Sequence, residues 1–440
     1  MWRLLIGFNV RVSQSLILIS LVAASLADVS AGDWRSFQNG GVPVVSDAGY
    51  AAEWTPESGI TWQQPLAGYG QSTPVVMGDH IFVTSVSGDL KDNLHVQAFD
   101  LKTGAALWKF DAKNSSPVKS TSYVSKAAPT PVCDGHGVIA LFEGGNVVAL
   151  TSDGARRWDR DLVADYGSVV SRHGLSSSLE QTDELVFVWI ERSEKPYVLA
   201  LSKKTGETVW KTDGLGVTSW SSPRLVPVGK TYHLVLSGVG RIAGLDPSTG
   251  RKLWEFDGIS GNSTPTPVPL SDGRFLIGAT VGRSESGGGK AADSNGVIQI
   301  SGSPADGFKA DYVWRAQSAT SSFGSPIAHN GLAWFVNREG ILYCLDVRTG
   351  EEKYARRTAS SIWSTPLVIG NRLYLFGKDG TTTVLNASAD FDVQAENSLW
   401  SAEPADDQSE SFGRPVLYAA AAADSTLILR RGDRLFAIRP

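Results

Sequence analysis

Aromatic and basic residues recur at two kinds of position in this 440-residue sequence and could together bind a ligand. An aromatic residue stands just before a short Ser- or Pro-containing motif, as Trp220 precedes Ser-Ser-Pro and Trp363 precedes Ser-Thr-Pro. Flat rings stack on planar ligands, and cations beside them bind anionic groups. The candidate binding residues are Tyr69, His173, Trp220, Phe323, Trp363, Phe412, Arg241, Arg338 and Lys378.

A structural explanation of the same residues stays open. An aromatic ring before Ser-Ser-Pro also packs well between neighbouring strands. Turns are rich in polar residues because their backbone groups need water or a side-chain partner. The two explanations differ in whether the rings are exposed together on one face.

Other chemistry has weaker support. No Gly-x-Ser-x-Gly motif occurs, so the sequence gives no nucleophile-elbow signal. His95 and His233 fall within or beside strand-like runs, where a lone histidine is more often a hydrogen-bonded side chain than a base. The two cysteines, Cys133 and Cys344, have no metal-binding spacing. We therefore predict no catalytic residue and no metal ligand.

A repeated segment indicates which elements position the candidate residues. Its clearest form is Ala-x-Asp-x-x-Thr-Gly-x-x-x-Trp, with close copies at 98–108, 200–210, 244–254 and 344–354. Short alternating runs such as HIFVTSV and RLYLFG lie between the copies and are typical of strands. The closing aromatic residue recurs every 40 to 60 residues, at Trp62, Trp108, Trp158, Trp210, Trp254, Trp314, Tyr354 and Trp400. Periods of this length, with about four strands each, predict propeller blades.

Eight closing aromatic residues predict eight blades. The last unit, from Phe412 to Pro440, has three strand-like runs and no closing aromatic residue, whereas a lone strand near 53–63 ends in Trp62. We therefore expect an all-β, eight-bladed β-propeller of four-stranded antiparallel blades, with the N-terminal strand joining the C-terminal blade. In such a ring the candidate binding residues share one face, at the mouth of the central channel.

The repeated residues have structural roles of their own. The Asp carboxylate accepts N–H groups of the turn, the Gly adopts a positive φ, and the closing Trp packs against the next blade. Burial of an indole, roughly 150–250 Å², contributes on the order of 4–6 kcal/mol before opposing terms. We expect these tryptophans to hold the ring together.

This repeat resembles the tryptophan-docking motif of the pyrroloquinoline-quinone (PQQ) repeat propellers, and the resemblance covers residues 50 to 440. That family includes eight-bladed quinoprotein dehydrogenases, the propeller lipoprotein of outer-membrane β-barrel assembly, and exported repeat proteins without an assigned activity. The dehydrogenases share an adjacent cysteine pair over the quinone and a Glu, an Asn and an Asp that hold Ca²⁺, whereas Cys133 and Cys344 are not adjacent. The lipoprotein carries an acylated cysteine after its signal peptide, and no cysteine stands there in this chain. The resemblance therefore favours the third group. PQQ and Ca²⁺ are cofactors only of the dehydrogenase alternative.

The first residues resemble an export signal. Arg3 and Arg11 precede an apolar run from Leu16 to Ala27, which ends in small residues suited to cleavage. We expect a signal peptide at 1–27, a lead-in segment at 28–50 and one propeller at 51–440. The protein is then periplasmic or extracellular, with no membrane span after cleavage.

The overall charge excludes a general attraction to polyanions. Lys+Arg 40 against Asp+Glu 45 gives a net charge of −5, so neither nucleic acid nor an anionic membrane is an expected partner. We expect a monomer that acts as a ligand- or protein-binding or scaffolding module, with its site at the channel mouth. The ligand would be a protein or a small flat anion. The alternatives are a divergent PQQ-dependent dehydrogenase and an outer-membrane protein assembly-type scaffold.

Overall fold

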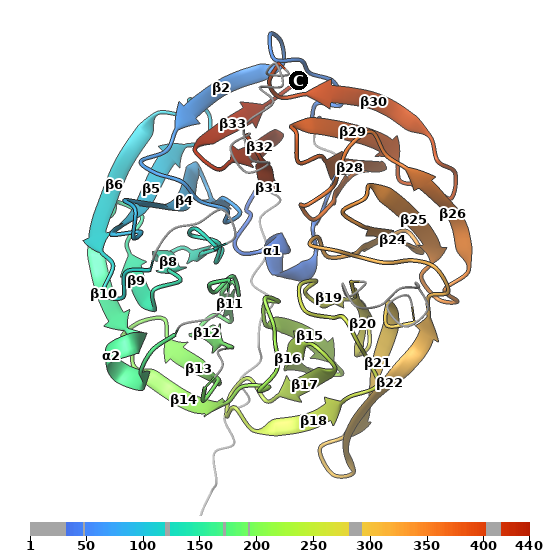
Figure 1. The fold of residues 1–440 in the computed structure, drawn as a ribbon, viewed down its shortest axis with the longest axis horizontal. Helices are drawn as coiled ribbons and strands as arrows, with labels where there is room; N and C mark the ends of the chain where they lie inside the picture. The colour runs from blue at the N-terminus through green and yellow to red at the C-terminus, as the bar shows by residue number, and fades with distance from the viewer. Residues whose placement is uncertain are drawn as a thin grey trace, which may run out of the picture.

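The strands form eight sheets around a central axis (Figure 1), as the repeat predicts. The computed structural model describes residues 32–46, 49–118, 124–169, 173–191, 194–280, 293–401 and 415–440. The expected signal peptide and Phe412 lie outside these residues. Within them the fold is almost all β, with two short helices, α1 (Gln38–Gly41) and α2 (Leu162–Tyr166). The prediction of an eight-bladed propeller is confirmed.

Six blades consist of four consecutive antiparallel strands. They are β3 (Val75–Met77), β4 (His80–Ser87), β5 (Asn93–Asp100) and β6 (Ala106–Lys113); β7 (Val132–Asp134), β8 (Gly137–Leu141), β9 (Asn146–Leu150) and β10 (Arg156–Asp161); β11 (Glu180–Gln181), β12 (Leu185–Ile190), β13 (Tyr197–Ser202) and β14 (Thr208–Asp213); β15 (Arg224–Val228), β16 (Thr231–Gly238), β17 (Arg241–Leu245) and β18 (Lys252–Phe256); β19 (Val268–Pro269), β20 (Arg274–Ile277), β21 (Gly296–Ser303) and β22 (Gly307–Arg315); and β23 (Ile327–His329), β24 (Leu332–Val336), β25 (Ile341–Asp346) and β26 (Glu352–Arg357).

The other two blades include strands from the N-terminal part of the chain. Strands β27 (Leu367–Ile369), β28 (Arg372–Phe376), β29 (Thr381–Asn386) and β30 (Val393–Ser398) form a sheet that β1 (Val44–Val45) extends, in parallel with β27. Strands β31 (Leu417–Ala423), β32 (Thr426–Arg431) and β33 (Arg434–Ile438) take β2 (Ile60–Pro65) as their outer strand. Trp62 of β2 lies opposite Ala437 of β33, so one blade combines residues from both ends of the propeller.

Burial along the strands follows their position in a blade. The second and third strands are largely buried on both faces because they lie between two neighbouring blades, and some, such as β12, are apolar throughout. Outer strands such as β6 alternate between more and less exposed residues because one face meets solvent. The core is therefore a series of apolar layers between successive blades.

The closing tryptophans pack on the next blade as predicted. Trp210 lies over Gly250 of the following repeat, where an added Cβ would be 2.5 Å from the indole, and its Nε1–H donates to the carbonyl of Pro247 at 2.9 Å. Gly250 has φ +72°, so this glycine provides both the turn and the space for the ring. Other pairs of this kind are Trp62 with Gly104, Trp108 with Gly154, Trp158 with Gly206, and Trp314 with Gly350.

Residues 32–45 lie in the central channel, where α1 sits on the axis of the ring (Figure 1). Trp34 exchanges two backbone hydrogen bonds with Val76 of β3, and the carbonyl of Arg35 accepts the N–H of Cys133 in β7. On the other side of the channel the Gln38 amide donates to Thr365 at 3.1 Å, close to β27. The described residues of the expected lead-in segment thus connect inner strands of several blades.

A buried histidine makes stability depend on pH. The Nδ1 atom of His233 in β16 accepts the Trp254 indole N–H at 2.9 Å, and the ring of Phe308 packs edge-on against it at 4.5 Å. Burial lowers the pKa of His233 to about 4, although Asp246 acts in the opposite direction. A protonated ring would carry a hydrogen on Nδ1 and break the bond from Trp254.

His233 is therefore expected to stabilise the fold fully above its unfolded pKa of about 6.5, and to lose this contribution as the pH falls toward 4. His233→Gln should reduce the difference in unfolding free energy between pH 7 and pH 4.5, as measured by urea titration. The exposed His136→Gln serves as the control and should keep the wild-type difference. An unchanged pH dependence in His233→Gln would contradict this assignment.

Candidate functional site

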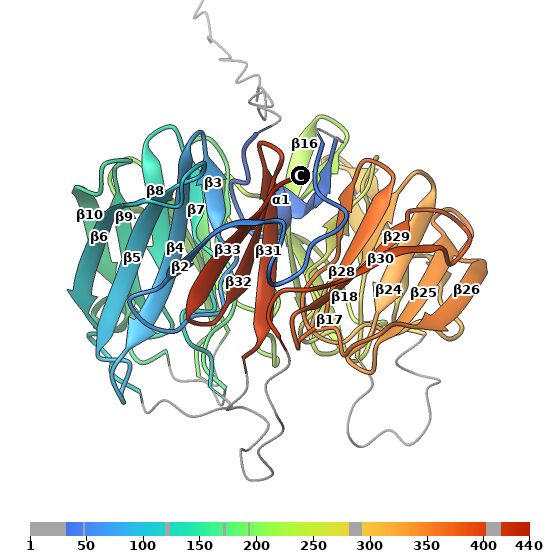
Figure 2. The same cartoon turned by 90° about the horizontal axis from the view of Figure 1, so that it is seen from above.

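The described candidate binding residues lie at one face of the ring, which we call the mouth face, in its loops or, for Arg241, at the start of β17. It consists of the loops that lead into the innermost strands and the loops between the second and third strands of each blade, and it faces the viewer in Figure 1. In the view turned by 90° it lies along the lower edge (Figure 2). The structure therefore tests which of these side chains meet one another.

His173 and Trp220 meet across two neighbouring blades. Their ring centroids are 5.6 Å apart and the rings are inclined by 52°. The backbone of Trp220 is tied to the blades on both sides: its N–H donates to the carbonyl of Ser263 at 2.7 Å, and its carbonyl accepts the Ser176 hydroxyl at 3.0 Å. The indole is only partly buried, so part of this ring faces solvent.

A second group, the aromatic cluster, consists of Phe323, Trp363 and Lys378. The two rings are 5.1 Å apart, and the Lys378 ammonium lies 4.3 Å from the centre of the Trp363 ring. Phe323 is 43% exposed. The Lys378 loop is anchored by its N–H on the carbonyl of Ser361 at 2.8 Å. A cation over an exposed aromatic surface is an arrangement suited to binding a partner.

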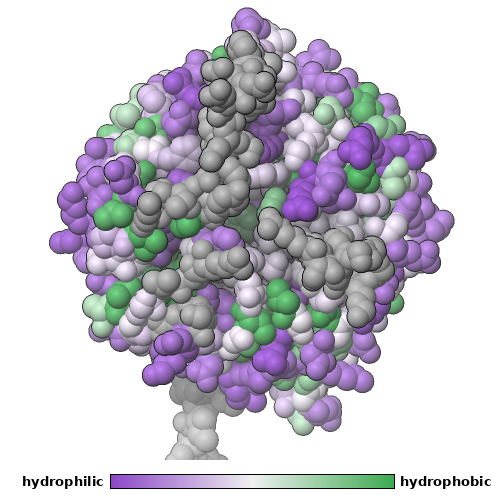
Figure 3. Space-filling view, viewed as in Figure 1, coloured by the Kyte–Doolittle hydropathy of each residue, from purple (hydrophilic) through white to green (hydrophobic). Residues whose placement is uncertain are grey.

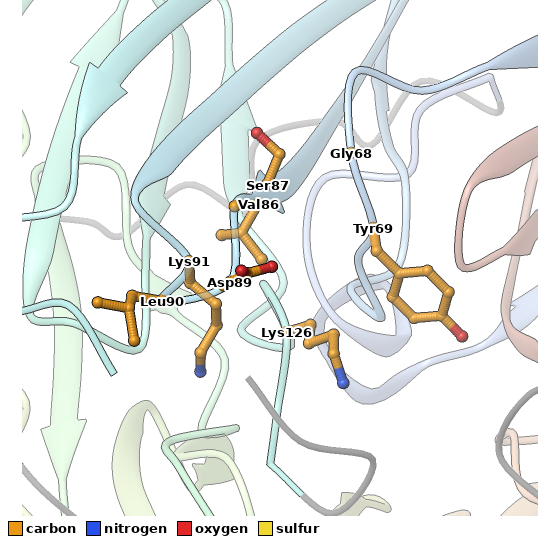
Figure 4. Close-up of a pocket in the computed structure, with 9 residues that line it drawn as sticks. Gly68, Tyr69, Val86, Ser87, Asp89, Leu90, Lys91 and Lys126 are labelled. Atoms are coloured by element: carbon orange, nitrogen blue, oxygen red, sulfur yellow. The ribbon is translucent and has the colours of Figure 1, made fainter. Parts of the chain in front are cut away.

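Tyr69 lies apart from both groups. Its hydroxyl is 2.9 Å from that of Tyr418, and the Lys126 ammonium is 5.7 Å from its ring centre. Burial, together with the neighbouring Tyr418, raises the pKa of Tyr69 well above its ordinary value. Tyr69 and Lys126 line a cleft of about 670 Å³ beside the β4–β5 loop (Figure 4).

The two candidate arginines form ion pairs within their own blades. Arg241 lies 3.0 Å from Glu255 of β18, and Arg338 lies 2.8 Å from Glu339. Both pairs are solvent-exposed, so each basic charge is partly neutralised before a ligand arrives. The structure thus brings most of the described candidates into two aromatic contacts and a separate cleft, and it places the two arginines in neither.

Two apolar residues of the mouth face were missed in the sequence. Leu90 between β4 and β5 is 45% exposed, and Val239 between β16 and β17 is 40% exposed. Figure 3 shows apolar side chains gathered on this face near β15 and β16. Leu90 and Val239 each stand next to a glycine-containing turn. A large apolar side chain in a turn is unusual, and this signal could have identified both residues from the sequence.

The residues present do not fit a quinone-and-calcium site of the kind implied by the resemblance. Cys133 in β7 and Cys344 in β25 are buried in different blades, and burial raises the pKa of both thiols, that of Cys344 to about 12. Among the described residues no three His, Cys, Asp or Glu side chains gather closely enough to hold a metal ion. We therefore derive no reaction step through these cofactors.

Eight blades, several of them docked on the next blade by a closing tryptophan, define this protein as a propeller of PQQ-like repeats. The family model described as outer membrane protein assembly factor BamB matches residues 20–188, 194–280 and 304–440, and the chain belongs to this family. None of the helices in the described part of the chain is long and apolar enough to cross a membrane.

Relatives of two kinds resemble the chain. A quinoprotein ethanol dehydrogenase from Pseudomonas aeruginosa is 28% identical over 229 residues, which span 44% of this chain and 34% of that enzyme. The crystal structure of BamB from Moraxella catarrhalis matches 87% of this chain and 99% of that chain, with a TM-score of 0.59 and 14% identity. Quinohemoprotein alcohol dehydrogenase from Comamonas testosteroni matches 92% of this chain and 80% of that chain, with a TM-score of 0.62 and 14% identity. At this identity the two structures show the shared fold.

Proposed function

We propose that this protein is an exported binding or scaffolding module that holds a protein partner on its mouth face. The observation that carries the proposal is the aromatic cluster, in which exposed Phe323 lies against Trp363 beneath a lysine ammonium. Aromatic residues in partly exposed clusters supply much of the binding energy at protein interfaces. Leu90 and Val239 add apolar surface on the same face.

The filled channel favours a partner that binds on the surface. Trp34 and Gln38 are almost completely buried in the channel and are bonded to strands on opposite sides of it. The N-terminal segment therefore fills the channel below the mouth face. A bound molecule would contact the loops of the blades on this face. A folded protein can contact the loops of several blades at once, whereas a small flat anion cannot.

The family supports the same role. Its model carries the description of an outer membrane protein assembly factor, and we infer that this chain also works by holding another protein. The dehydrogenase alternative rests on the 28% identical quinoprotein relative, of which the chain spans 34%. It is disfavoured because the cysteine pair and the calcium ligands do not match.

The double variant Phe323→Ala/Trp363→Ala is expected to reduce partner recovery at least ~10-fold, since hot-spot aromatic residues each contribute about 2 kcal/mol or more. The measurement is affinity purification from the periplasmic fraction of the native organism, with partners quantified by mass spectrometry. Val209→Ala changes an exposed outer-strand residue far from the mouth face and is the matched control. Equal recovery by both variants, with intact thermal unfolding, would overturn the proposal.

A thermal-shift measurement with PQQ and Ca²⁺ distinguishes the two functions. A cofactor that binds only the folded state adds about 2.7 kcal/mol at a hundredfold excess over Kd. We expect no shift in Tm with PQQ and Ca²⁺ together. A clear shift would favour the dehydrogenase alternative instead.

A further inference from the structure

Three side chains on neighbouring strands form a continuous hydrogen-bonded chain beside the cleft that Tyr69 and Lys126 line. The Ser87 hydroxyl in β4 lies 2.8 Å from Nε2 of His95 in β5. Nδ1 of His95 lies 2.6 Å from a carboxylate oxygen of Asp111 in β6. This order of serine, histidine and aspartate is the one that activates a serine hydroxyl as a nucleophile.

The register of the blade produces this arrangement. His95 lies directly opposite Ser85 in β4 and opposite Asp111 in β6. Ser87 is two residues beyond Ser85, so its side chain points to the same face of the sheet. The three residues are separated by hairpins in the sequence, and strand pairing alone brings them together.

Charge fixes the direction of the hydrogen bonds. Burial acts to raise the pKa of Asp111, but the bonds from Lys109 and His95 outweigh it, and the pKa lies below its ordinary value. The Lys109 ammonium is 2.9 Å from the second carboxylate oxygen. An ionised carboxylate only accepts, so Nδ1 of His95 carries a hydrogen. In the neutral ring Nε2 is then the acceptor for the Ser87 hydroxyl.

An amide donor lies beside the serine oxygen. The side-chain N–H of Asn93 donates to Ser87 Oγ at 3.3 Å, and the Asn93 carbonyl oxygen accepts from the Lys113 ammonium at 2.7 Å. The lysine thereby fixes which end of the amide faces the serine. The amide therefore holds the Ser87 hydroxyl oxygen in place beside Nε2 of His95.

The serine lies at the edge of a cleft. Ser87 is only partly buried and is one of the residues that line the cleft of about 670 Å³, a size suited to a small organic ligand. Figure 4 shows the Ser87 hydroxyl directed away from Lys91 and Lys126, at the outer edge of the cleft. His95 is buried behind it, whereas the Asp111 carboxylate at the other end of the hydrogen-bonded chain is half exposed.

The geometry points to a second, esterase-type site in which Ser87 is the nucleophile, His95 the general base and Asp111 the residue that orients it. The substrate class is a small carboxylic ester. Ser87 Oγ bonds to the ester carbonyl carbon while His95 Nε2 takes the hydroxyl proton, and the proton then passes to the departing alcohol. In the second step water attacks the acyl carbon on Ser87 while His95 Nε2 takes a proton from the water. The bond from this carbon to Ser87 Oγ then breaks, the carboxylic acid leaves, and His95 gives the proton back to Ser87 Oγ.

The test is covalent labelling of the full folded chain with a fluorophosphonate probe, followed by mass spectrometry of the Ser87 peptide. We expect stoichiometric labelling at Ser87, with a rate that falls ~100-fold or more in His95→Gln. Asp111→Asn should slow labelling as well, because Nδ1 of His95 then loses its ionised acceptor. Hydrolysis of p-nitrophenyl acetate should fall in parallel in each variant.

Ser85→Ala is the matched control, because Ser85 lies on the same strand and face and its buried hydroxyl has no hydrogen-bond partner among the described residues. It should label as the wild type does. Thermal unfolding of every variant shows whether reduced labelling comes from the altered hydrogen-bonded chain or from loss of the folded structure. Absence of labelling in the folded wild-type protein, or equal labelling of wild type and folded His95→Gln, would overturn the assignment.

Discussion

Trp210→Ala is expected to lower the free energy of unfolding by about 3–5 kcal/mol, the cost of removing a buried aromatic side chain. Trp210 is 8% exposed and closes the blade β11–β14 against the next blade. Its ring lies 5.9 Å from that of Phe187 and covers Gly250. A Cβ at position 250 would lie 2.5 Å from the indole, so the contact leaves no room for a side chain there. Alanine would leave a cavity between two blades and free the carbonyl of Pro247 from its indole donor.

The measurement is urea unfolding followed by far-UV circular dichroism, which does not depend on tryptophan emission. Val209→Ala is the control, since this neighbour on the same strand is 53% exposed and should change stability by no more than about 0.5 kcal/mol. A loss below about 1 kcal/mol for Trp210→Ala would mean that the blades are not held together by the closing tryptophans.

Arg224→Leu is expected to cost about 3–5 kcal/mol, because it leaves a buried carboxylate without its partner. The Arg224 guanidinium is 3.0 Å from Glu180 of the neighbouring inner strand, and both side chains are buried. It also donates at 3.1 Å to the carbonyl of Phe37 and to the side chain of Gln38 in the channel. The variant therefore loses an ion pair and the anchor of the N-terminal segment together.

The double variant Arg224→Leu/Glu180→Leu separates these two effects. Burial raises the pKa of Glu180, and Arg224 opposes that rise. Without Arg224 the raised pKa makes the variant relatively more stable below about pH 4.5 than at pH 7, since the buried group is then neutral. Removal of both charges should restore much of the lost stability at pH 7. The exposed Arg338→Leu should cost less than about 1 kcal/mol, and a similar cost for Arg224→Leu would show that the buried pair is dispensable.

The blades could be predicted from the sequence because their signals are local. Each Asp-x-x-Thr-Gly turn and closing Trp specify one blade through contacts within about 45 residues, as for Trp210 with Gly250. The N-terminal strand that carries Trp62 was expected near 53–63, because the last unit has no closing aromatic residue, and the structure places it at Ile60–Pro65. Both inferences count repeated residues and need no knowledge of distant contacts.

The channel segment and the serine–histidine chain could not be predicted in this way. Gln38 contacts Thr365, 327 residues away, and although Thr365 belongs to the Ser-Thr-Pro motif after Trp363, Gln38 belongs to no repeated motif. Ser87 and Asp111 meet His95 only through strand register, which the sequence does not reveal. The ion pairs of Arg241 and Arg338 likewise depend on side-chain positions, which the sequence does not reveal.

The course of the chain through the channel also decides how the molecule can be attached to a surface. Asp33 accepts the N–H of Gly78 in the β3–β4 turn, on the face opposite the mouth face. The turn before β33 lies beside Gly70 on the mouth face, and the strand then runs away from it, so the C-terminal end lies on the opposite face as well (Figure 2). A tether, an affinity tag or an immobilising support joined at either end of the described chain thus leaves the aromatic cluster directed outwards, free to receive a partner.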